Sequence, residues 1–531
     1  MVSLKNIIGR IFGVRDTGSI FEPAIGAVSA PELEHCRLAQ QRLVDGALDE
    51  AKMEFELALH LNSLCAAAHY GLADIARQQR RHHDAAQSYC AGLVAGGSTS
   101  PAIAAALELQ TRHRAQDAVP IYRCLLERET ASVHVLCNFA LALRENAEYV
   151  EARSLLERAS EIEPDNLVLK YNYATVLADL GDLNQSVDLY FGYLAHHPED
   201  KGAYVTRGLV RLLNLDFANG WEDYECRRES VECRRPFRFP EWDGADCRGR
   251  TLLVYGEQGL GDEIMFASCM PDVLRRADKV ILECEPRLAS LFARSFPTVK
   301  VHGRKTLGDT DWLREAGHID YQIALGSLPR LFRRSLSDFP DHVGYLRADP
   351  ARIAYWREQL AKLPGGATVG LSWRGGNELT RRNLRSLDPS QLEPLLRVEN
   401  VSFVNLQYGD VVAECAKLAA PIFRFDDAMK DYDETAALVC ALDLVVSVQT
   451  SIVHLAGAFG KPVWAMLPFS PEWRYMRSGD RMLWYPSVKL IRQPKPKDWG
   501  AVVDVVARQL AEHAHGVCDQ APSGFVIAPK I

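Results

Sequence analysis

The sequence lacks any long uninterrupted run of apolar residues. A helix that crosses a bilayer needs about 18 or more consecutive residues that are mostly apolar, and no such stretch occurs in the 531 residues. We therefore expect no membrane-spanning segment. An excess of basic residues is also missing, since 61 Lys and Arg are outnumbered by 69 Asp and Glu. That balance argues against a general nucleic-acid binder, which needs cationic surface to displace condensed counterions.

Paired cysteine motifs are absent as well. The 13 cysteines form no C-x-x-C pair and no Cys/His cluster with zinc spacing. Several of them, including Cys124, Cys137 and Cys440, lie in apolar stretches. We interpret them as buried, reduced thiols and expect a cytoplasmic protein. With 47% apolar and 24% charged residues, the composition is that of a globular protein, and the length predicts several domains.

An internal period of 34 residues is the strongest pattern in the first half. A small residue is followed four positions later by a large apolar residue, and the pair recurs along the chain. The pairs are Ala51/Phe55, Ala85/Tyr89, Ala118/Tyr122, Ala152/Leu156, Ser186/Tyr190 and Gly220/Tyr224. Their first members stand 34, 33, 34, 34 and 34 residues apart, and a proline follows twelve residues after Ala152 and after Ser186. Such a period indicates stacked helical hairpins.

This pattern resembles the tetratricopeptide repeat, a helical hairpin of about 34 residues. The small residue lets two helices approach, the large residue fills the gap between neighbouring hairpins, and the proline ends the second helix. We predict a helical solenoid over residues 31–235, after an N-terminal tail at 1–30. Its concave face suits a protein or peptide partner, and a rigid spacer or dimerisation arm is the alternative.

The second half alternates short β-branched runs with helical patterns. Clear strand candidates are 251–255 and 279–284, and a second series starts near residue 366. Alternating βαβ units predict parallel sheets covered by helices, with ligands at the carboxyl ends of the strands. The expected parts are two doubly wound Rossmann-like domains at 245–350 and 365–513 and a C-terminal tail at 514–531.

A glycine-rich loop follows the first predicted strand. Gly256, Gly259 and Gly261 stand between the strand and a helix, where glycines let a ligand approach the backbone. Asp262 opens that helix and is either a helix cap or a general base. The order of the glycines is not that of a dinucleotide site, although Glu283 at the end of the next strand keeps an oxidoreductase open as a minor alternative.

A second loop, near residue 449, carries hydroxyls and a histidine. Gln449, Thr450 and Ser451 follow a strand, and His454 lies one turn into the next helix. Hydroxyls beside the free N–H groups of a helix can cradle a phosphate. The simpler alternatives are plain helix capping and a packed histidine.

A third loop follows the predicted strand that ends near residue 372. It contains Trp373, two glycines and an arginine cluster with Arg382 and Arg385. Arginines near a glycine turn suit a diphosphate, and the alternative is a solvated basic loop. Further on, Asp431 and Asp433 precede a helix, where capping is the better explanation than a metal site.

Several stretches together resemble bacterial tetratricopeptide proteins with a C-terminal glycosyltransferase domain. The stretches include GWEDYECR, LLVYGEQGLGDEIMFAS, VGLSWRGG, RRNLRSL and DETAALVCALDLVVSVQTSIVHLAGAFGKPVWAMLPFSPEWR. The domain is similar to the heptosyltransferase-like glycosyltransferase family 9 with the GT-B fold, and the plan is similar to that of the protein O-GlcNAc transferases.

The resemblance implies inverting, metal-independent transfer of a sugar from a nucleotide-sugar, without a cofactor. It implies that residues 245–350 form the acceptor side and residues 365–513 the nucleotide-sugar side. It also implies Asp262 as the catalytic base and Thr450, Ser451 and His454 as ligands of the donor diphosphate. The family has Asp where this chain has Gln449, which removes a charge while keeping hydrogen-bonding groups.

We therefore expect a bacterial glycosyltransferase, in one interpretation a protein-glycosylating one that acts on a protein held by the repeats. Transfer to lipopolysaccharide or capsule is a second possibility. A non-catalytic scaffold or nucleotide-sensing protein, with a lapsed donor site marked by Gln449, is the alternative from another class. The donor sugar, the nucleotide base, the acceptor and the oligomeric state stay open.

Overall fold

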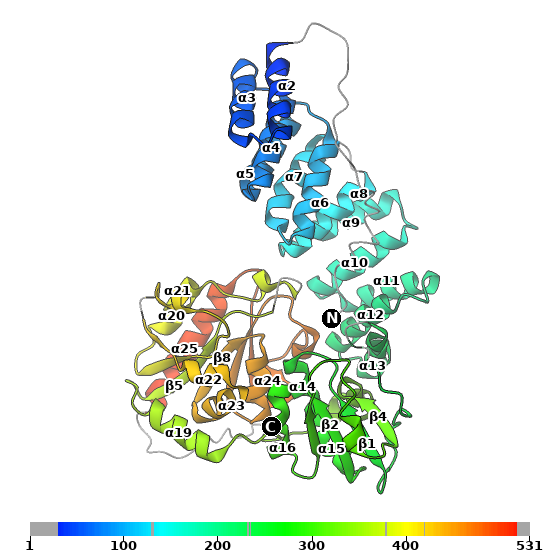
Figure 1. Cartoon of the computed structure of the whole chain (residues 1–531), viewed down its shortest axis with the longest axis vertical. Helices are drawn as coiled ribbons and strands as arrows, with labels where there is room; N and C mark the ends of the chain where they lie inside the picture. Colours follow the sequence, from blue (N-terminus) through cyan, green and yellow to red (C-terminus); the bar gives the residue numbers. More distant parts are fainter. Residues whose placement is uncertain are drawn as a thin grey trace. The chain divides into compact units, whose positions relative to one another are not determined.

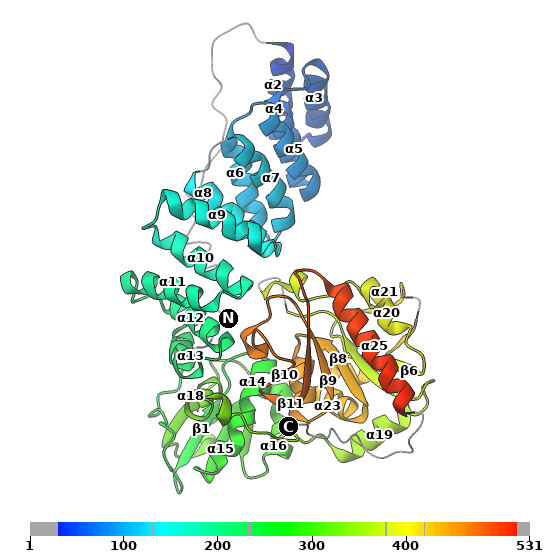
Figure 2. The same ribbon diagram turned by 180° about the vertical axis from the view of Figure 1, so that it is seen from behind.

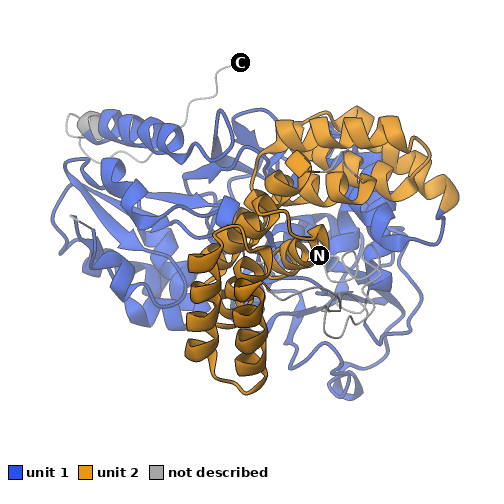
Figure 3. Ribbon diagram, turned by 90° about the horizontal axis from the view of Figure 1, so that it is seen from above, with its two compact units in different colours: residues 1–2, 197–531 blue, residues 3–196 orange. Residues whose placement is uncertain are grey.

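The computed structural model describes residues 30–128, 132–230, 233, 235–376, 380–418 and 420–517. The chain divides into two compact units (Figure 3), a repeat unit of residues 3–196 and an α/β unit of residues 197–531 with 1–2. Most of the two predicted tails, residues 1–29 and 518–531, lies outside the described residues.

In the described part of the repeat unit, consecutive helices pair into antiparallel hairpins (Figure 1). The hairpins are α2 Pro31–Val44 with α3 Leu48–Leu61, α4 Ala66–Gln78 with α5 His82–Val94, α6 Thr99–Thr111 with α7 Ala115–Arg128, α8 Val133–Glu145 with α9 Tyr149–Ile162, and α10 Leu167–Leu180 with α11 Leu183–His196. The predicted helical solenoid is confirmed.

The small–large pairs read from the sequence lie in the second helix of each hairpin, and their members are buried. Phe55 also packs against the next hairpin, as predicted for the large residue of a pair, since a Cβ at Gly71 in α4 would lie 2.1 Å from its ring. Within the hairpin of α4 and α5, a Cβ at Gly92 would lie 2.3 Å from the ring of Tyr70. Glycine at these two positions therefore leaves the space that the aromatic rings occupy.

A sixth hairpin, α12 Lys201–Leu213 with α13 Phe217–Tyr224, belongs to the α/β unit. A short 3-10 helix, η1 Glu225–Glu229, follows it. Trp221 of α13 is fully buried, and its indole N–H donates to the carbonyl of Arg333 at 2.7 Å. Its ring also packs against Phe266 and Trp473 from the two sheet-bearing parts. The sixth hairpin is thus joined to the sheets by a shared aromatic core.

The first sheet of the α/β unit has four parallel strands in the order β3-β2-β1-β4. Its strands are β1 Thr251–Tyr255, β2 Lys279–Cys284, β3 Lys300–Gly303 and β4 Tyr321–Ala324. The segments between them form α14 Leu260–Phe266, α15 Met270–Leu274, α16 Ala289–Ser295, α17 Leu313–Ala316 and, after β4, α18 Leu328–Phe332. The bounds of β1 and β2 agree with the strands predicted at 251–255 and 279–284.

The second sheet has seven strands in the order β10-β11-β9-β8-β5-β6-β7, all parallel except β10 (Figure 2). They are β5 Ala367–Ser372, β6 Val401–Asn405, β7 Ile422–Phe423, β8 Leu444–Val448, β9 Val463–Leu467, β10 Arg481–Met482 and β11 Tyr485–Arg492. The helices are α19 Pro350–Leu360, α20 Glu393–Leu396, α21 Val412–Cys415, α22 Asp426–Lys430, α23 Tyr432–Ala441, α24 Ser451–Ala458 and α25 Trp499–Val517. A parallel α/β region is therefore confirmed in this half.

Within the residues that the structure describes, no helix combines the length and the apolar character needed to cross a membrane.

Candidate functional site

The loops after β1 and β8 meet, although they lie far apart in the sequence. Helix α14 packs against α24, and Gly261 of α14 faces α24. A Cβ at Gly261 would lie 3.2 Å from the ring of His454 and 3.4 Å from the Cα of Ser451. The predicted glycine loop and the predicted hydroxyl loop therefore form one site.

Gly256 of this loop is closely packed within the protein, whereas Gly259 has only ordinary contacts. A Cβ at Gly256 would lie 2.3 Å from the carboxylate of Glu263, and one at Gly259 would lie 3.4 Å from that of Asp262. Gly259 is the N-cap of α14, so Asp262 does not cap the helix. The capping alternative for Asp262 is thus not realised, and its carboxylate is directed to another partner.

That partner is Arg474, which follows β9 and lies in the 3-10 helix η9 Trp473–Tyr475. Arg474 also donates from Nη1 to the carboxylate of Glu472 at 2.6 Å. The other oxygen of Glu472 accepts from Arg385, whose Nη2 donates to the carbonyl of Gln449 at 3.1 Å. We call Asp262, Arg474, Glu472 and Arg385 the ion-pair chain.

The ion-pair chain fixes the charge of its members. Burial opposes ionisation of Glu472, but Arg385 and Arg474 outweigh it and lower the pKa of this carboxyl to about 2. Nearby, burial and then the charge of Arg474 lower the pKa of His454 to about 3. His454 is therefore neutral at pH 7, and its Nδ1 pairs with the hydroxyl of Tyr485 at 3.2 Å.

The hydroxyl loop combines a cap with an unsatisfied amide. Thr450 is the N-cap of α24, where its hydroxyl accepts from the N–H of Ile452 at 3.2 Å, so the capping interpretation is confirmed. Gln449 is only 2% exposed, and neither Oε1 nor Nε2 of its side chain has a hydrogen-bond partner. A buried amide left unpaired is costly, which indicates a position kept for water or a ligand.

Other predicted residues lie further from this centre. Trp373 is fully buried in the core beneath the second sheet, and its indole N–H donates to Glu414 at 3.0 Å. Its side chain thus packs in the core, and a contact of Trp373 with a donor stays a prediction. Arg382 is exposed in a short 3-10 turn.

The Asp431/Asp433 pair is explained by structure. The carboxylate of Asp431 caps α23 by accepting from the N–H of Asp433 at 2.8 Å, and Asp433 forms a bidentate pair with Arg294 at 2.6 and 2.9 Å. In the described part of the chain, no three His, Cys, Asp or Glu residues are grouped as metal ligands.

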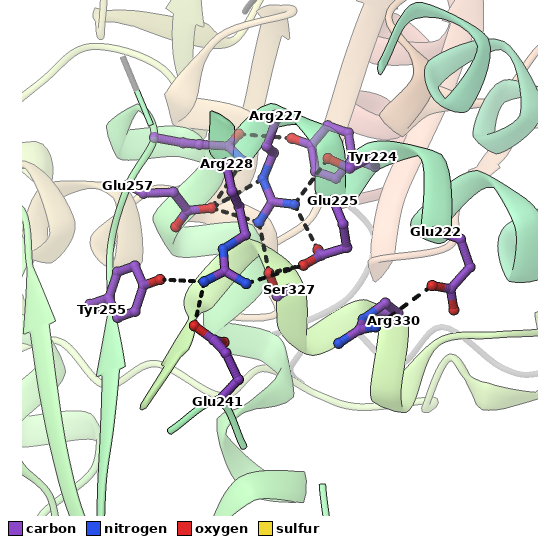
Figure 4. Close-up of polar contacts among 11 residues, drawn as sticks. Glu222, Tyr224, Glu225, Arg227, Arg228, Glu241, Tyr255, Glu257, Ser327 and Arg330 are labelled. Carbon is purple, nitrogen blue, oxygen red and sulfur yellow. Dashed lines mark hydrogen bonds and ion pairs between the residues drawn. The ribbon is translucent and has the colours of Figure 1, made fainter. Parts of the chain in front are cut away.

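Sequence reasoning missed a second polar cluster, which links the sixth hairpin to the glycine loop (Figure 4). Arg227 of η1 donates to Glu257 at 2.9 Å and to Glu225 at 2.8 Å, and all three side chains are largely buried. Tyr224 donates to Gln258 at 2.9 Å. The only signal in the sequence is the run of charged residues after Tyr224, which does not reveal its partners.

Comparison with known proteins supports the repeats and supplies one long relative. A family model for the tetratricopeptide repeat matches residues 143–206. Protein FlbA of Caulobacter vibrioides is 32% identical, in an alignment that covers 71% of this chain and 72% of FlbA.

Solved repeat proteins align with about a third of the chain. YrrB, described as a tetratricopeptide protein with an unusual peptide-binding site, shares 18% identity with a TM-score of 0.27, covering 34% of this chain and 92% of YrrB. A tetratricopeptide protein of Thermus thermophilus, TTC0263, shares 18% identity with a TM-score of 0.19, covering 34% of this chain and 99% of its own.

Proposed function

This chain belongs to the family of the Caulobacter vibrioides protein FlbA, and we propose that its α/β unit is a glycosyltransferase of the GT-B type, similar to family 9. It would move a sugar from a nucleotide-sugar to an acceptor hydroxyl. The observation that carries the proposal is the meeting of the loops after β1 and β8, which places Asp262 beside the N-terminal end of α24 and the arginines of the ion-pair chain.

The chemistry follows from these positions. Asp262 takes the proton of the acceptor hydroxyl, whose oxygen attacks the anomeric carbon from the face opposite the nucleotide. The bond from that carbon to the diphosphate breaks, and the electron pair leaves with the nucleoside diphosphate. Arg385 and the N-terminal end of α24 stabilise the charge that develops on the leaving group. Neutral His454 donates or accepts a hydrogen bond without adding charge.

A thermal-shift panel with UDP, GDP, ADP, CDP and dTDP tests the donor site. A ligand at 100 times its dissociation constant stabilises the folded state by about 2.7 kcal/mol, which is a shift of a few degrees for a chain of this size. We expect a shift with one nucleotide and a smaller one in Thr450→Ala, each compared with the same variant without ligand. Ser390→Ala, at an exposed turn distant in sequence, is the matched control.

A second variant tests the base. Asp262→Asn should show a nucleotide shift at least as large as that of the parent and lose sugar transfer, measured as release of the nucleoside diphosphate from the matching nucleotide-sugar in the presence of acceptor. Transfer at the parent rate would remove Asp262 from the role of base.

We further propose that the repeat unit holds a protein or peptide that carries the acceptor hydroxyl, because tetratricopeptide hairpins build extended binding surfaces. A chain without residues 31–196 keeps the sixth hairpin and should still bind nucleotide while losing the partner. Partner binding that survives this deletion would move recognition to the α/β unit. The free thiols among the described residues fit a cytoplasmic protein.

Gln449 favours a second candidate, a nucleotide-sensing scaffold without turnover. Glycosyltransferase family 9 has Asp at this position, and in this chain it is replaced by an amide that has no hydrogen-bond partner in the structure. A nucleotide shift together with no hydrolysis or transfer of any nucleotide-sugar would support the sensor. Transfer to lipopolysaccharide or capsule precursors instead of protein would identify a polysaccharide enzyme.

A further inference from the structure

We propose that Arg474 is a positioning residue that exchanges partners when a diphosphate binds. In the free protein its guanidinium holds the carboxylate of Asp262, and a bound diphosphate draws Arg474 away and leaves Asp262 free to act as a base. The effect of this exchange on sugar transfer rests on the proposed function. The exchange itself is an anion-binding event and can be measured without any transfer.

The ion-pair chain provides the path. Arg385 is anchored on the carbonyl of Gln449, at the loop that precedes α24. Glu472 bridges Arg385 and Arg474 with its two oxygens, and Arg474 in turn bridges Glu472 and Asp262. An anion that binds Arg385 is therefore separated from the Arg474–Asp262 pair by one carboxylate, and it competes with that carboxylate for both guanidinium groups.

Charge explains why an exchange follows. Two arginines and two carboxylates sum to zero, and His454 beside them is neutral. A diphosphate brings at least two negative charges into this poorly hydrated site, where they need new cationic partners. Guanidinium groups bind phosphate oxygens in bidentate geometry, so the arginines satisfy the anion best by turning from their carboxylates. Asp262, part-exposed, can take water in place of Arg474.

Unused hydrogen-bond donors mark the same place. The Nε–H groups of Arg385 and Arg474 are both buried and have no acceptor. The amide of Gln449 is buried with neither end paired. Three groups, on the loops after β5, β8 and β9, therefore have hydrogen bonds still to make, although the two arginines are already ion-paired. Their number fits an acceptor with many oxygens, such as a diphosphate.

Titration calorimetry with inorganic pyrophosphate on the full chain tests the exchange, at one fixed ionic strength. Asp262→Asn should bind pyrophosphate about tenfold more tightly, because the variant no longer competes for Arg474. Arg474→Gln should bind about tenfold more weakly. The double variant should match Arg474→Gln alone, since Asp262 acts through Arg474. Loss of the negative charge of Asp262 by itself also favours an anion, but that effect would persist in the double variant.

The matched controls are exposed ion-paired residues of the same unit. Asp427→Asn and Arg397→Gln remove charges that are more than two-thirds exposed, and each should change the affinity less than about twofold. Unchanged or weaker binding in Asp262→Asn overturns the exchange, and so do additive effects in the double variant. If the parent binds neither pyrophosphate nor any nucleotide of the panel, the proposed function falls together with the exchange.

A second measurement needs no variant of the site. Carbodiimide labelling of carboxylates, read by mass spectrometry, should modify Asp262 several-fold faster once pyrophosphate is added. Asp433, held by Arg294, is the internal reference and should not change. Slower labelling of Asp262 would mean that the anion covers the carboxylate instead of releasing it, and would overturn the proposal.

Discussion

The two units of the chain bury different kinds of side chain. Among described residues of the repeat unit, the buried charged side chains are Asp117 and Asp179, each paired with an arginine. The described part of the α/β unit buries many more. They are Arg207, Asp223, Arg227, Arg235, Glu257, Glu263, Glu283, Arg304, Arg333 and Arg474.

The difference shows which interactions each unit depends on. The hairpins are held together by contacts between Ala, Leu and Tyr side chains. Burial of this apolar surface stabilises the fold without requiring a particular contact geometry. Buried charges are stable only with partners in the right geometry, and losing one partner leaves the other uncompensated. We therefore expect the α/β unit to be sensitive to changes of charge and the repeat unit to changes of volume.

The largest effect should come from Arg227→Gln. Removing the guanidinium leaves Glu257 buried without its cation and Glu225 with Arg228 at 3.8 Å, which costs about 3–5 kcal/mol. Urea unfolding gives the free energy, and hydrogen exchange of peptides from 251–284 should rise while that of peptides from 133–196 stays constant. A loss below about 1 kcal/mol would show that the α/β unit does not depend on its buried ion pairs for stability.

Leu156→Ala is the reciprocal experiment in the repeat unit. Leu156 is fully buried in α9, and its truncation should cost about 2–5 kcal/mol through lost burial and a cavity. In this variant, hydrogen exchange should rise in peptides from 133–196 and stay constant in those from 251–284. Equal loosening of both sets would show that the units are not independent in stability.

An effect of intermediate size is expected from His454 on acidification. Its folded pKa of about 3 lies below the ordinary 6.5, so the unfolded chain takes up the proton first and stability falls as the pH drops from 6.5 towards 3. Between pH 7 and 5.5 the parent should lose about 1 kcal/mol relative to His454→Gln. Parallel urea midpoints of the two proteins over this range would contradict the assignment.

The smallest effect should come from Arg123→Gln in the repeat unit. Arg123 pairs with Glu148 and Glu151, as Arg227 pairs with two carboxylates, but it is about half exposed. We expect a change within about 0.5 kcal/mol, because water replaces the lost partner. A loss of stability close to that of Arg227→Gln would show that solvent exposure does not explain the difference between the two arginines.

Repeats and strands could be predicted from the sequence. Period and strand composition are local signals, and the rule that ligands gather at the carboxyl ends of parallel strands selected the loops that carry Asp262 and Thr450. The prediction of a solenoid and of α/β layers succeeded for this reason. Only the resemblance to family 9 assigned these two residues to one site, because β1 and β8 belong to different sheets.

The partners within the site could not be predicted. Arg474 stands 212 residues from Asp262, and nothing in the local pattern links them. Gly220 and Tyr224 fit the repeat as well as earlier pairs do, yet Trp221 between them bonds to Arg333, 112 residues away, which ties the sixth hairpin to the sheets. Such contacts depend on tertiary packing, which residue spacing does not report.

The absence of a side chain at Gly261 is linked to the close packing of α14 against α24. The backbone of Gly261 is of a kind that any residue adopts, so the requirement for glycine arises from space alone. A methyl group there would lie 3.2 Å from the ring of His454, which must move aside by a few tenths of an ångström. The size of the side chain at this position therefore reports how closely the two helices pack. In any relative, the size of the side chain aligned with Gly261 indicates whether its two loops can close as tightly, before a structure is determined.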